Sequence, residues 1–171
     1  MADGASKRTS RSEAKKAHVG HAELEAVQAA CRVLVAISSQ SIAAVEDQVD
    51  LTQFRALVIL ASRGSVSLGE LADAAKLHLS TASRMCDRMV VAGLMNRADD
   101  PANRRQLMLT LTDGGRRVVE DVMRQRRAAL EPMLAAMPKP RRAELVALLQ
   151  EFAASGPPPA EPDLWFMGWS T

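Results

Sequence analysis

The chain of 171 residues contains only two cysteines, Cys31 and Cys86, and they lie far apart in the sequence. Small secreted domains held together by disulfides carry larger sets of cysteines, so we expect no disulfide framework and a cytoplasmic location. Residues 1–20 contain no apolar segment of the kind found in a secretory signal, and no such signal is expected. An apolar run of about 18 residues is also missing, so we expect no transmembrane span and no membrane partner.

Histidines are almost as scarce, and nothing in the sequence matches a catalytic motif. His18 and His21 belong to the N-terminal tail and His78 stands alone, so a metal site is not expected. We find no phosphate-binding loop, no metal-ligand spacing and no Ser/His/Asp or Cys/His arrangement. The sequence therefore predicts a protein that is not an enzyme and that has no catalytic residues, no metal ligands and no cofactor.

What is present is an ordinary globular composition with an uneven distribution of charge. Hydrophobic residues make up 47% of the chain and charged residues 25%, which suits one folded domain with an extension. The net charge is only +2, yet residues 1–20 and residues 79–117 each carry a surplus of three positive charges. The positive charge that attracts a polyanion therefore gathers in these two segments.

Hydrophobic spacing predicts helices through the first half of the chain. Residues 21–49 place apolar side chains mostly three or four positions apart, which is typical of a long helix packed against other helices. Thr52 and Gly64 mark the expected start and end of the next helix. Ser67 and Glu70 have the S-x-x-E spacing of a capping box, which predicts a short helix after them.

The segment LHLSTASRMCDRMVVAGL, residues 77–94, predicts a third helix that begins near Ser80 and ends at Gly93. One of its faces is apolar and has the spacing of a buried stripe: Ala82, Met85, Cys86 and Met89. The opposite face is hydroxylated and cationic: Ser80, Thr81, Ser83, Arg84 and Arg88. Three helices joined by short turns are typical of a helix-turn-helix.

The second half of the chain begins with a predicted β-hairpin and continues with two helices. The alternating runs LMNRADD and RQLMLTLT are separated by turn-forming residues, and the tip carries Arg104 and Arg105. Thr112 and Asp113 are expected to cap a long helix, which MPKP ends before a final helix that reaches residue 154. Residues 155–171 are expected to be a Pro-rich spacer and an apolar tail, which either docks on the dimer, the interpretation we favour, or forms a disordered tail.

A helix-turn-helix followed by a hairpin is a winged helix, and its parts suit double-stranded DNA. The third helix is slim enough for the major groove, where hydroxyls and arginines reach phosphates or base edges. The arginines of the hairpin tip suit a narrow minor groove. We therefore expect DNA contacts from seven residues: Ser80, Thr81, Ser83, Arg84, Arg88, Arg104 and Arg105. For Arg97, Arg116 and Arg117 we expect phosphate contacts or exposed ion pairs.

Residues 51–115 resemble the MarR family of winged-helix transcription regulators. The stretches that carry the resemblance are LTQFRALVIL, LGELADAAKLHLSTASRMCDRMVVAGLMNR and DDPANRRQLMLTLTDGG. The last follows the family's wing signature, D-x-R-x-x-x-V-x-L-T, at Asn103, Arg105, Leu109, Leu111 and Thr112, with Leu in place of Val and, more importantly, Asn103 in place of Asp. That Asp normally pairs with the signature arginine, so Asn103 is expected to leave a neutral hydrogen bond and to free Arg105 somewhat.

The resemblance implies a mainly α fold, in which a winged helix-turn-helix at residues 50–112 is flanked by dimerisation helices at 21–49 and 113–154. It also implies a homodimer that reads a palindromic DNA site, usually as a repressor, and that a small aromatic or anionic effector releases. Arg32 is a candidate contact for an anionic effector, and a surface position on the dimer is the alternative. Residues 1–20 are expected to form a disordered basic tail.

Two alternative functions stay open. One is a redox sensor, since one branch of the family senses peroxides through a cysteine in the first helix. That branch tunes its thiolate with tyrosines, and this chain contains none, so we expect Cys31 to be a buried structural thiol and Cys86 to be packing. The other is a winged helix that only bridges proteins. Salt dependence discriminates this one, because phosphate contacts make DNA affinity fall steeply with salt.

Overall fold

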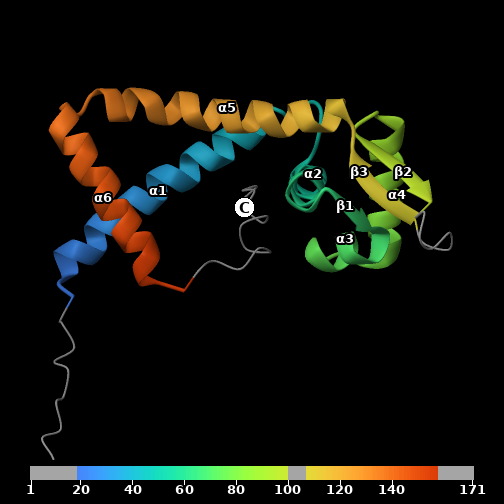
Figure 1. Cartoon of the computed structure of the whole chain (residues 1–171), viewed down its shortest axis with the longest axis horizontal. Helices are drawn as coiled ribbons and strands as arrows, with labels where there is room; N and C mark the ends of the chain where they lie inside the picture. The colour runs from blue at the N-terminus through green and yellow to red at the C-terminus, as the bar shows by residue number, and fades with distance from the viewer. Residues whose placement is uncertain (1–18, 100–106, 158–171) are drawn as a thin grey trace, which may run out of the picture. The chain divides into compact units, whose positions relative to one another are not determined.

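The computed structural model describes residues 19–99 and 107–157, which form six helices and three strands (Figure 1). Their order and bounds are α1 (His21–Ala43), α2 (Leu51–Arg63), β1 (Ser65–Ser67), α3 (Leu68–Ala74), α4 (Leu79–Val91), β2 (Met95–Asp99), β3 (Leu107–Leu111), α5 (Asp113–Ala135) and α6 (Lys139–Ser155). The mainly helical winged-helix fold expected from the sequence is therefore confirmed. Nearly all of the basic tail, the hairpin tip and the apolar C-terminal segment lie outside the described residues.

The chain divides into two compact units, residues 1–33 and residues 34–171. The first contains the N-terminal part of α1, whose Leu24 and Val27 are exposed. The second contains the rest of α1 and every other described element. The winged helix and its core lie entirely within this second unit.

Of the helices in the described part of the chain, α1 alone is long and apolar enough to cross a membrane by length and composition, with a mean hydropathy of 1.3. The expectation of no transmembrane span was based on uninterrupted apolar runs, which α1 lacks, and it stays a prediction. A search for an uninterrupted apolar run misses α1, because polar side chains are scattered among the apolar ones. Only 11% of this stretch is buried within the structure, so its apolar side chains have little cover in one chain.

The end of α1 differs from the sequence prediction of a helix through residue 49. The helix ends at Ala43, and residues 44–48 form turns, one of them closed by the Val45 N–H donating to the Ile42 carbonyl. Val45 and Val49 are thereby buried in the core. Apolar spacing could not reveal this break, because a packed turn and a continuing helix both bury every third or fourth residue.

Capping explains where the next helix begins, and here the expectation of Thr52 was wrong. Asp50 caps α2: its carboxylate accepts from the Gln53 N–H at 2.8 Å, and the Gln53 side chain accepts from the Asp50 N–H at 2.9 Å. Gly64 ends α2 as expected, with a φ of 77° that favours glycine.

The capping box expected at Ser67 is confirmed at the start of α3. The Glu70 N–H donates to the Ser67 hydroxyl oxygen at 3.2 Å, and the Ser67 N–H and hydroxyl both donate to the Glu70 carboxylate. Those bonds to the ionised carboxylate lower the pKa of Glu70. α4 follows after a turn in which Lys76 has a φ of 56° and the Leu77 N–H donates to the Ala72 carbonyl.

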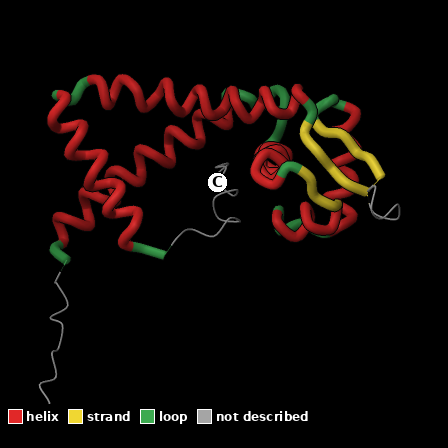
Figure 2. The backbone as a smooth tube through the Cα atoms, in the orientation of Figure 1, coloured by secondary structure: helices red, strands yellow, loops and turns green. Residues whose placement is uncertain are grey.

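A three-stranded antiparallel sheet forms the wing and its support, in the order β1-β3-β2 (Figure 2). The hairpin of β2 and β3 confirms the sequence prediction, whereas β1 was not expected, because three residues are too few to give an alternating pattern. Leu109 at the centre of β3 pairs with Val66 on one side and with Arg97 on the other. Val66 and Leu109 are buried, so the base of the wing belongs to the core.

The start of α5 is fastened to the end of α4 by Thr112, which caps α5 as expected. Its hydroxyl donates to the Gly93 carbonyl at 2.7 Å and accepts from the Gly115 N–H at 3.0 Å. Gly115 lies so close to the turn between α4 and β2 that a Cβ on it would stand 2.1 Å from the Leu94 carbonyl oxygen. Thr112, the last residue of the wing signature, and the two glycines after it thus hold the start of α5 against the turn that follows α4.

The N-terminal half of α5 packs on α2, and the C-terminal half and α6 carry exposed apolar side chains. Val118, Val119 and Val122 of α5 are buried. α6 has no buried residue. Its exposed apolar side chains, with those at the end of α5, are Met133, Leu134, Val146, Leu148, Leu149 and Phe152.

Candidate nucleic-acid interface

α4 has the two faces that its sequence predicts. Ala82, Met85, Cys86 and Met89 are buried against the core, and Ser80, Thr81, Arg84 and Arg88 are exposed, with Ser83 half-buried at the edge. Because successive residues of a helix are about 100° apart, Ser80, Arg84 and Asp87 form one stripe opposite the buried face. We refer to Ser80, Arg84, Asp87 and Val91 as the outer stripe. It is a convex surface with hydroxyl, cationic and anionic groups in sequence.

The start of α4 is exposed and lacks a side-chain cap. The helix begins at Leu79 after His78, whose side chain makes no capping hydrogen bond, so the expected start near Ser80 was one residue late. Ser80 lies inside the first turn, and its carbonyl accepts a hydrogen bond of 3.3 Å from the Arg84 Nε. The hydroxyl of Ser80 is therefore not engaged as the helix cap, and the first turn presents backbone N–H groups and hydroxyls together.

A close ion pair joins α4 to the wing. Arg97 of β2 donates from Nη1 to Oδ1 of Asp87 at 2.6 Å. The Arg97 side chain is 26% exposed and that of Asp87 is 56% exposed. Of the two roles expected for Arg97, phosphate contact or ion pair, the structure has the ion pair, although it is more buried than the sequence suggested.

The other cationic candidates divide between described and undescribed parts of the chain. Arg116 and Arg117 are exposed in the first turn of α5. Arg104, Arg105 and Asn103 belong to residues 100–106, which lie outside the described residues. The strands on either side of them are in place, in register from Met95 with Leu111 to Asp99 with Leu107.

The two cysteines differ from each other in burial. Cys86 is fully buried on the packed face of α4, as expected, and burial raises the pKa of its thiol to about 11. Cys31 is exposed, which corrects the expectation of a buried structural thiol. The expectation failed because the apolar face of α1 on which it was placed is largely uncovered in a single chain.

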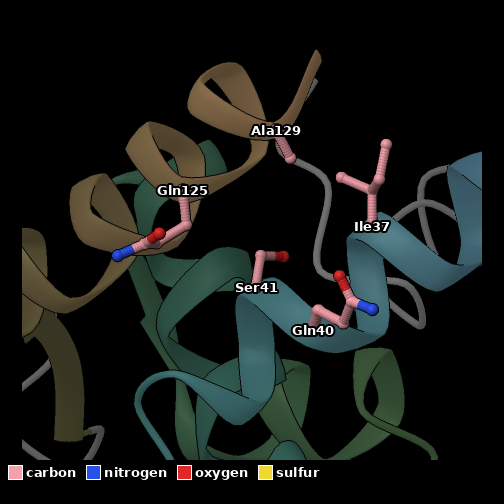
Figure 3. A pocket seen from close by; sticks show the side chains of 5 residues that line it. All are labelled: Ile37, Gln40, Ser41, Gln125 and Ala129. Carbon is pink, nitrogen blue, oxygen red and sulfur yellow. The ribbon is translucent and has the colours of Figure 1, made fainter. Parts of the chain in front are cut away.

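A small pocket opens between α1 and α5 within the second unit (Figure 3). It has a volume of about 100 Å³ and is lined by Ile37, Gln40 and Ser41 of α1 and by Gln125 and Ala129 of α5. Beside it, Arg126 is buried and its Nε donates to the Ser41 hydroxyl at 2.9 Å. Burial lowers the pKa of Arg126. Sequence reasoning missed this arginine, because it stands in a polar run of three arginines and one glutamine, residues 124–127, that looks like a solvated helix face.

Arg32, the candidate effector contact, is exposed on α1 and is not among the residues that line this pocket. The described histidines give no metal-binding arrangement either: within residues 19–99 and 107–157 no group of three ligating side chains comes together. The surface that combines charge, hydroxyls and a protruding helix is that of α4 and the wing.

Comparison with known proteins places this geometry among transcription regulators. Residues 49–107 match the model of the MarR family. The chain is 31% identical over 109 residues to YsmB of Bacillus subtilis, an uncharacterised HTH-type transcriptional regulator, covering 63% of this chain and 75% of that protein. Its fold matches the crystal structure of RV1404 from Mycobacterium tuberculosis with a TM-score of 0.69, at 38% identity and over 82% of this chain and 97% of that one. The transcriptional regulator Tm0710 from Thermotoga maritima has the same fold, with a TM-score of 0.69 at 21% identity over 80% and 94% of the two chains.

Proposed function

Because this chain belongs to the MarR family of DNA-binding transcriptional regulators, which are not enzymes, we propose that it is a cytoplasmic homodimeric repressor. In this proposal the dimer binds a palindromic operator, and a small molecule releases it. The observation that carries the proposal is the outer stripe of α4, which is exposed on the side of the helix opposite the core.

For the DNA contacts we retain the residues expected from the sequence. Ser80, Thr81 and Ser83, together with Arg84 and Arg88, would enter the major groove from α4, where arginine pairs with guanine edges or phosphates. Arg104 and Arg105 would reach the adjacent minor groove from the wing. The exposure of the α4 residues supports this assignment, since groups that read DNA have to be accessible.

A second copy of the chain would cover the apolar side chains that one chain leaves exposed. α1 and α6 both carry such side chains, including Leu24 and Val27 on α1 and Leu148 and Phe152 on α6. Each large apolar side chain contributes about 1.5–3 kcal/mol when it is fully buried. The dimerisation regions proposed are therefore residues 21–49 and 113–154, on either side of the DNA-binding residues 50–112.

The pocket between α1 and α5 is the place we assign to the effector. Its volume of about 100 Å³ is smaller than the roughly 150 Å³ cavity that holds benzene in an engineered protein. An aromatic effector would therefore have to part α1 from α5. Such a ligand prefers the parted state, and only that preference would shift the protein away from its DNA-bound form.

The test is fluorescence anisotropy of the protein on duplex DNA from just upstream of its own gene and on a scrambled duplex, across a salt series. Tight, selective binding by two subunits, weakening steeply with salt, supports the regulator. Binding that ignores both sequence and salt would instead support a winged helix that bridges proteins. Displacement of the bound DNA by a panel of small aromatic acids would then identify the effector class.

A further inference from the structure

Asp87 is the only acidic residue of α4, and it lies in the middle of the surface that meets DNA. On the outer stripe it stands between Arg84 and Val91, one turn from each. All members of this stripe are exposed. A carboxylate at this place is repelled by DNA phosphates, so its presence needs an explanation.

The partner of Asp87 comes from the wing and is held more firmly than Asp87 itself. In β2, Met95 is buried, Asn96 is exposed and Arg97 is half-buried, so the Arg97 side chain leaves the strand on the core side. Its backbone pairs with Leu109 of β3, which is fully buried. The sheet thus fixes the backbone from which the half-buried Arg97 side chain extends, and its Nη1 meets Asp87 Oδ1 at 2.6 Å.

This pair is the polar connection that the described residues show between the outer stripe and the hairpin. Hydrophobic contacts hold α4 and β2 against the same core, and they act on the inner side of α4 through its buried side chains. The ion pair adds a polar restraint between α4 and β2 on the outer side of the helix. It also neutralises Asp87 where it faces DNA.

We propose that Asp87 and Arg97 form a clamp that fixes the orientation of α4 relative to the wing, and that Asp87 is thereby a specificity-determining positioning residue. The clamp sets the spacing between the bases that α4 reads and the minor-groove site that the wing reaches. Asp87 repels DNA when α4 is out of register and is tolerated when α4 is seated, so it lowers non-specific affinity more than operator affinity. This inference rests on the DNA contacts proposed above.

The test compares four variants on a duplex enriched by the wild-type protein from a random library and on a scrambled duplex. Asp87→Ala removes the carboxylate, and Arg97→Met removes the guanidinium while keeping the packed stem. The double variant completes a thermodynamic cycle, and Asp73→Ala removes an exposed acid of α3 as the matched charge control. Melting temperature and dimer size establish that each variant is folded, and Asp87→Asn replaces Asp87→Ala in the cycle should the latter fail to fold.

For each single clamp variant we expect the ratio of selected to scrambled affinity to fall about tenfold, with no further fall in the double variant. Asp73→Ala should strengthen binding to both duplexes equally and leave the ratio unchanged. Hydroxyl-radical footprints should keep the protection at α4 and lose that at the wing in Asp87→Ala, a change that lower stability alone would not produce.

Three results would overturn the clamp. The first is that Asp87→Ala, like Asp73→Ala, leaves the ratio of selected to scrambled affinity unchanged. The second is that the losses in this ratio caused by the two single substitutions multiply in the double variant. In both cases selective wild-type binding leaves the proposed function standing. The third is a wild-type protein that enriches no sequence from the library, which contradicts the proposed function and removes the basis of the clamp with it.

Discussion

At the scale of single residues, Arg84 on the outer stripe of α4 is held by one weak hydrogen bond and can therefore be released to DNA at little cost in free energy. Arg84 is exposed and its side chain rests against the helix through the Ser80 carbonyl. This hydrogen bond is weak at 3.3 Å and lies on the surface, so releasing Arg84 to a phosphate or a guanine costs little.

Replacing Arg84 by Ala should therefore weaken operator binding without harm to the fold. A base contact would cost about 1–3 kcal/mol and relax selectivity, whereas a phosphate contact would weaken all duplexes alike and lower the salt slope by about one. The same loss is expected for the double change Arg104→Ala/Arg105→Ala. Anisotropy titrations in a salt series measure both effects. Arg63→Ala at the exposed end of α2, outside both the proposed DNA contacts and the proposed dimerisation regions, is the control, and an equal loss there would mean that net charge alone matters.

The two thiols give a second prediction at this scale. Burial raises the pKa of Cys86 to about 11 from an ordinary value of 9.0, so at pH 8 its thiolate is very rare in the folded protein. Cys31 is exposed. A thiol reagent at pH 8 should therefore modify one cysteine quickly and the other only on unfolding, as mass spectrometry of digests would identify. Fast modification of Cys86 would contradict its burial.

Linkage gives the sign of the pH dependence for the same group. The folded state holds the Cys86 proton more tightly than the unfolded state, so its contribution is complete below pH 9 and is lost as the pH rises towards about 11. The free energy of unfolding should fall across this range by roughly 2 kcal/mol, as two pKa units allow. Urea titrations of wild type and Cys86→Ala at pH 8 and pH 10.5 measure it, and an equal pH dependence in both would contradict the assignment.

At the scale of elements, the sequence was most informative where local chemistry decides the outcome. The Ser67–Glu70 box, the Gly64 stop, the Thr112 cap and the buried stripe of α4 were all readable, because each depends on residues within one or two turns. Thr52 was a wrong choice, although Asp50 with Gln53 has the same box spacing. Both residues are good caps, and only the reciprocal partner three positions on distinguishes them.

Elements defined by distant contacts were harder to predict. β1 is three residues long and exists only because β3 pairs with it. Residues 44–48 leave the helix so that Val45 and Val49 reach a core made mainly by α2. The Asp87–Arg97 pair joins residues ten apart across the turn between α4 and β2. None of these features has a periodic signature, because tertiary packing selects them.

The close approach of α5 to the turn after α4 yields a prediction about the start of α5. A methyl group at Gly115 would stand 2.1 Å from the Leu94 carbonyl oxygen, a distance that forces backbone to move. Gly115→Ala should therefore destabilise the protein by about 3 kcal/mol, at the upper end of the cost of overpacking. Gly69→Ala in α3 is the matched control, because its methyl would meet nothing closer than 4.0 Å.

The control should change stability in the opposite direction. Alanine is favoured over glycine within a helix by about 0.5–1 kcal/mol, so Gly69→Ala is expected to stabilise the fold. Chemical denaturation followed by circular dichroism measures both variants. Equal effects of the two substitutions would show that the space between Gly115 and the Leu94 carbonyl can accommodate a methyl group.

At the scale of the whole molecule, a single chain leaves the apolar stripe of its first helix largely exposed to solvent. The apolar stripe of residues 21–49 was expected to pack against other helices, yet Leu24, Val27 and Leu34 are exposed. Sequence periodicity reports that a face must be buried but not which chain buries it. The α6 pattern had the same ambiguity, since none of its residues is buried.

The proposed dimer would bury the exposed apolar faces of α1 and α6, and one charged substitution in its interface should dissociate it. Phe152 of α6 is 60% exposed in the single chain, and burying a glutamate in its place within an interface would leave a carboxylate without a partner. Phe152→Glu should therefore weaken the free energy of dimer association by several kcal/mol, so that the protein becomes monomeric. Sedimentation over a dilution series measures the shift.

Operator binding should fall together with the dimer, because a monomer holds only one half-site and loses the effective concentration that links the two winged helices. Leu51→Glu is the matched control: Leu51 is also an exposed apolar residue, at 44%, but it begins α2, outside the proposed dimerisation regions, where an acid favours the helix dipole. It should leave both the dimer and its DNA affinity unchanged. A Phe152→Glu protein that stays dimeric and binds DNA like wild type would show that α6 faces solvent in the working protein, and α1 alone would then have to carry the interface.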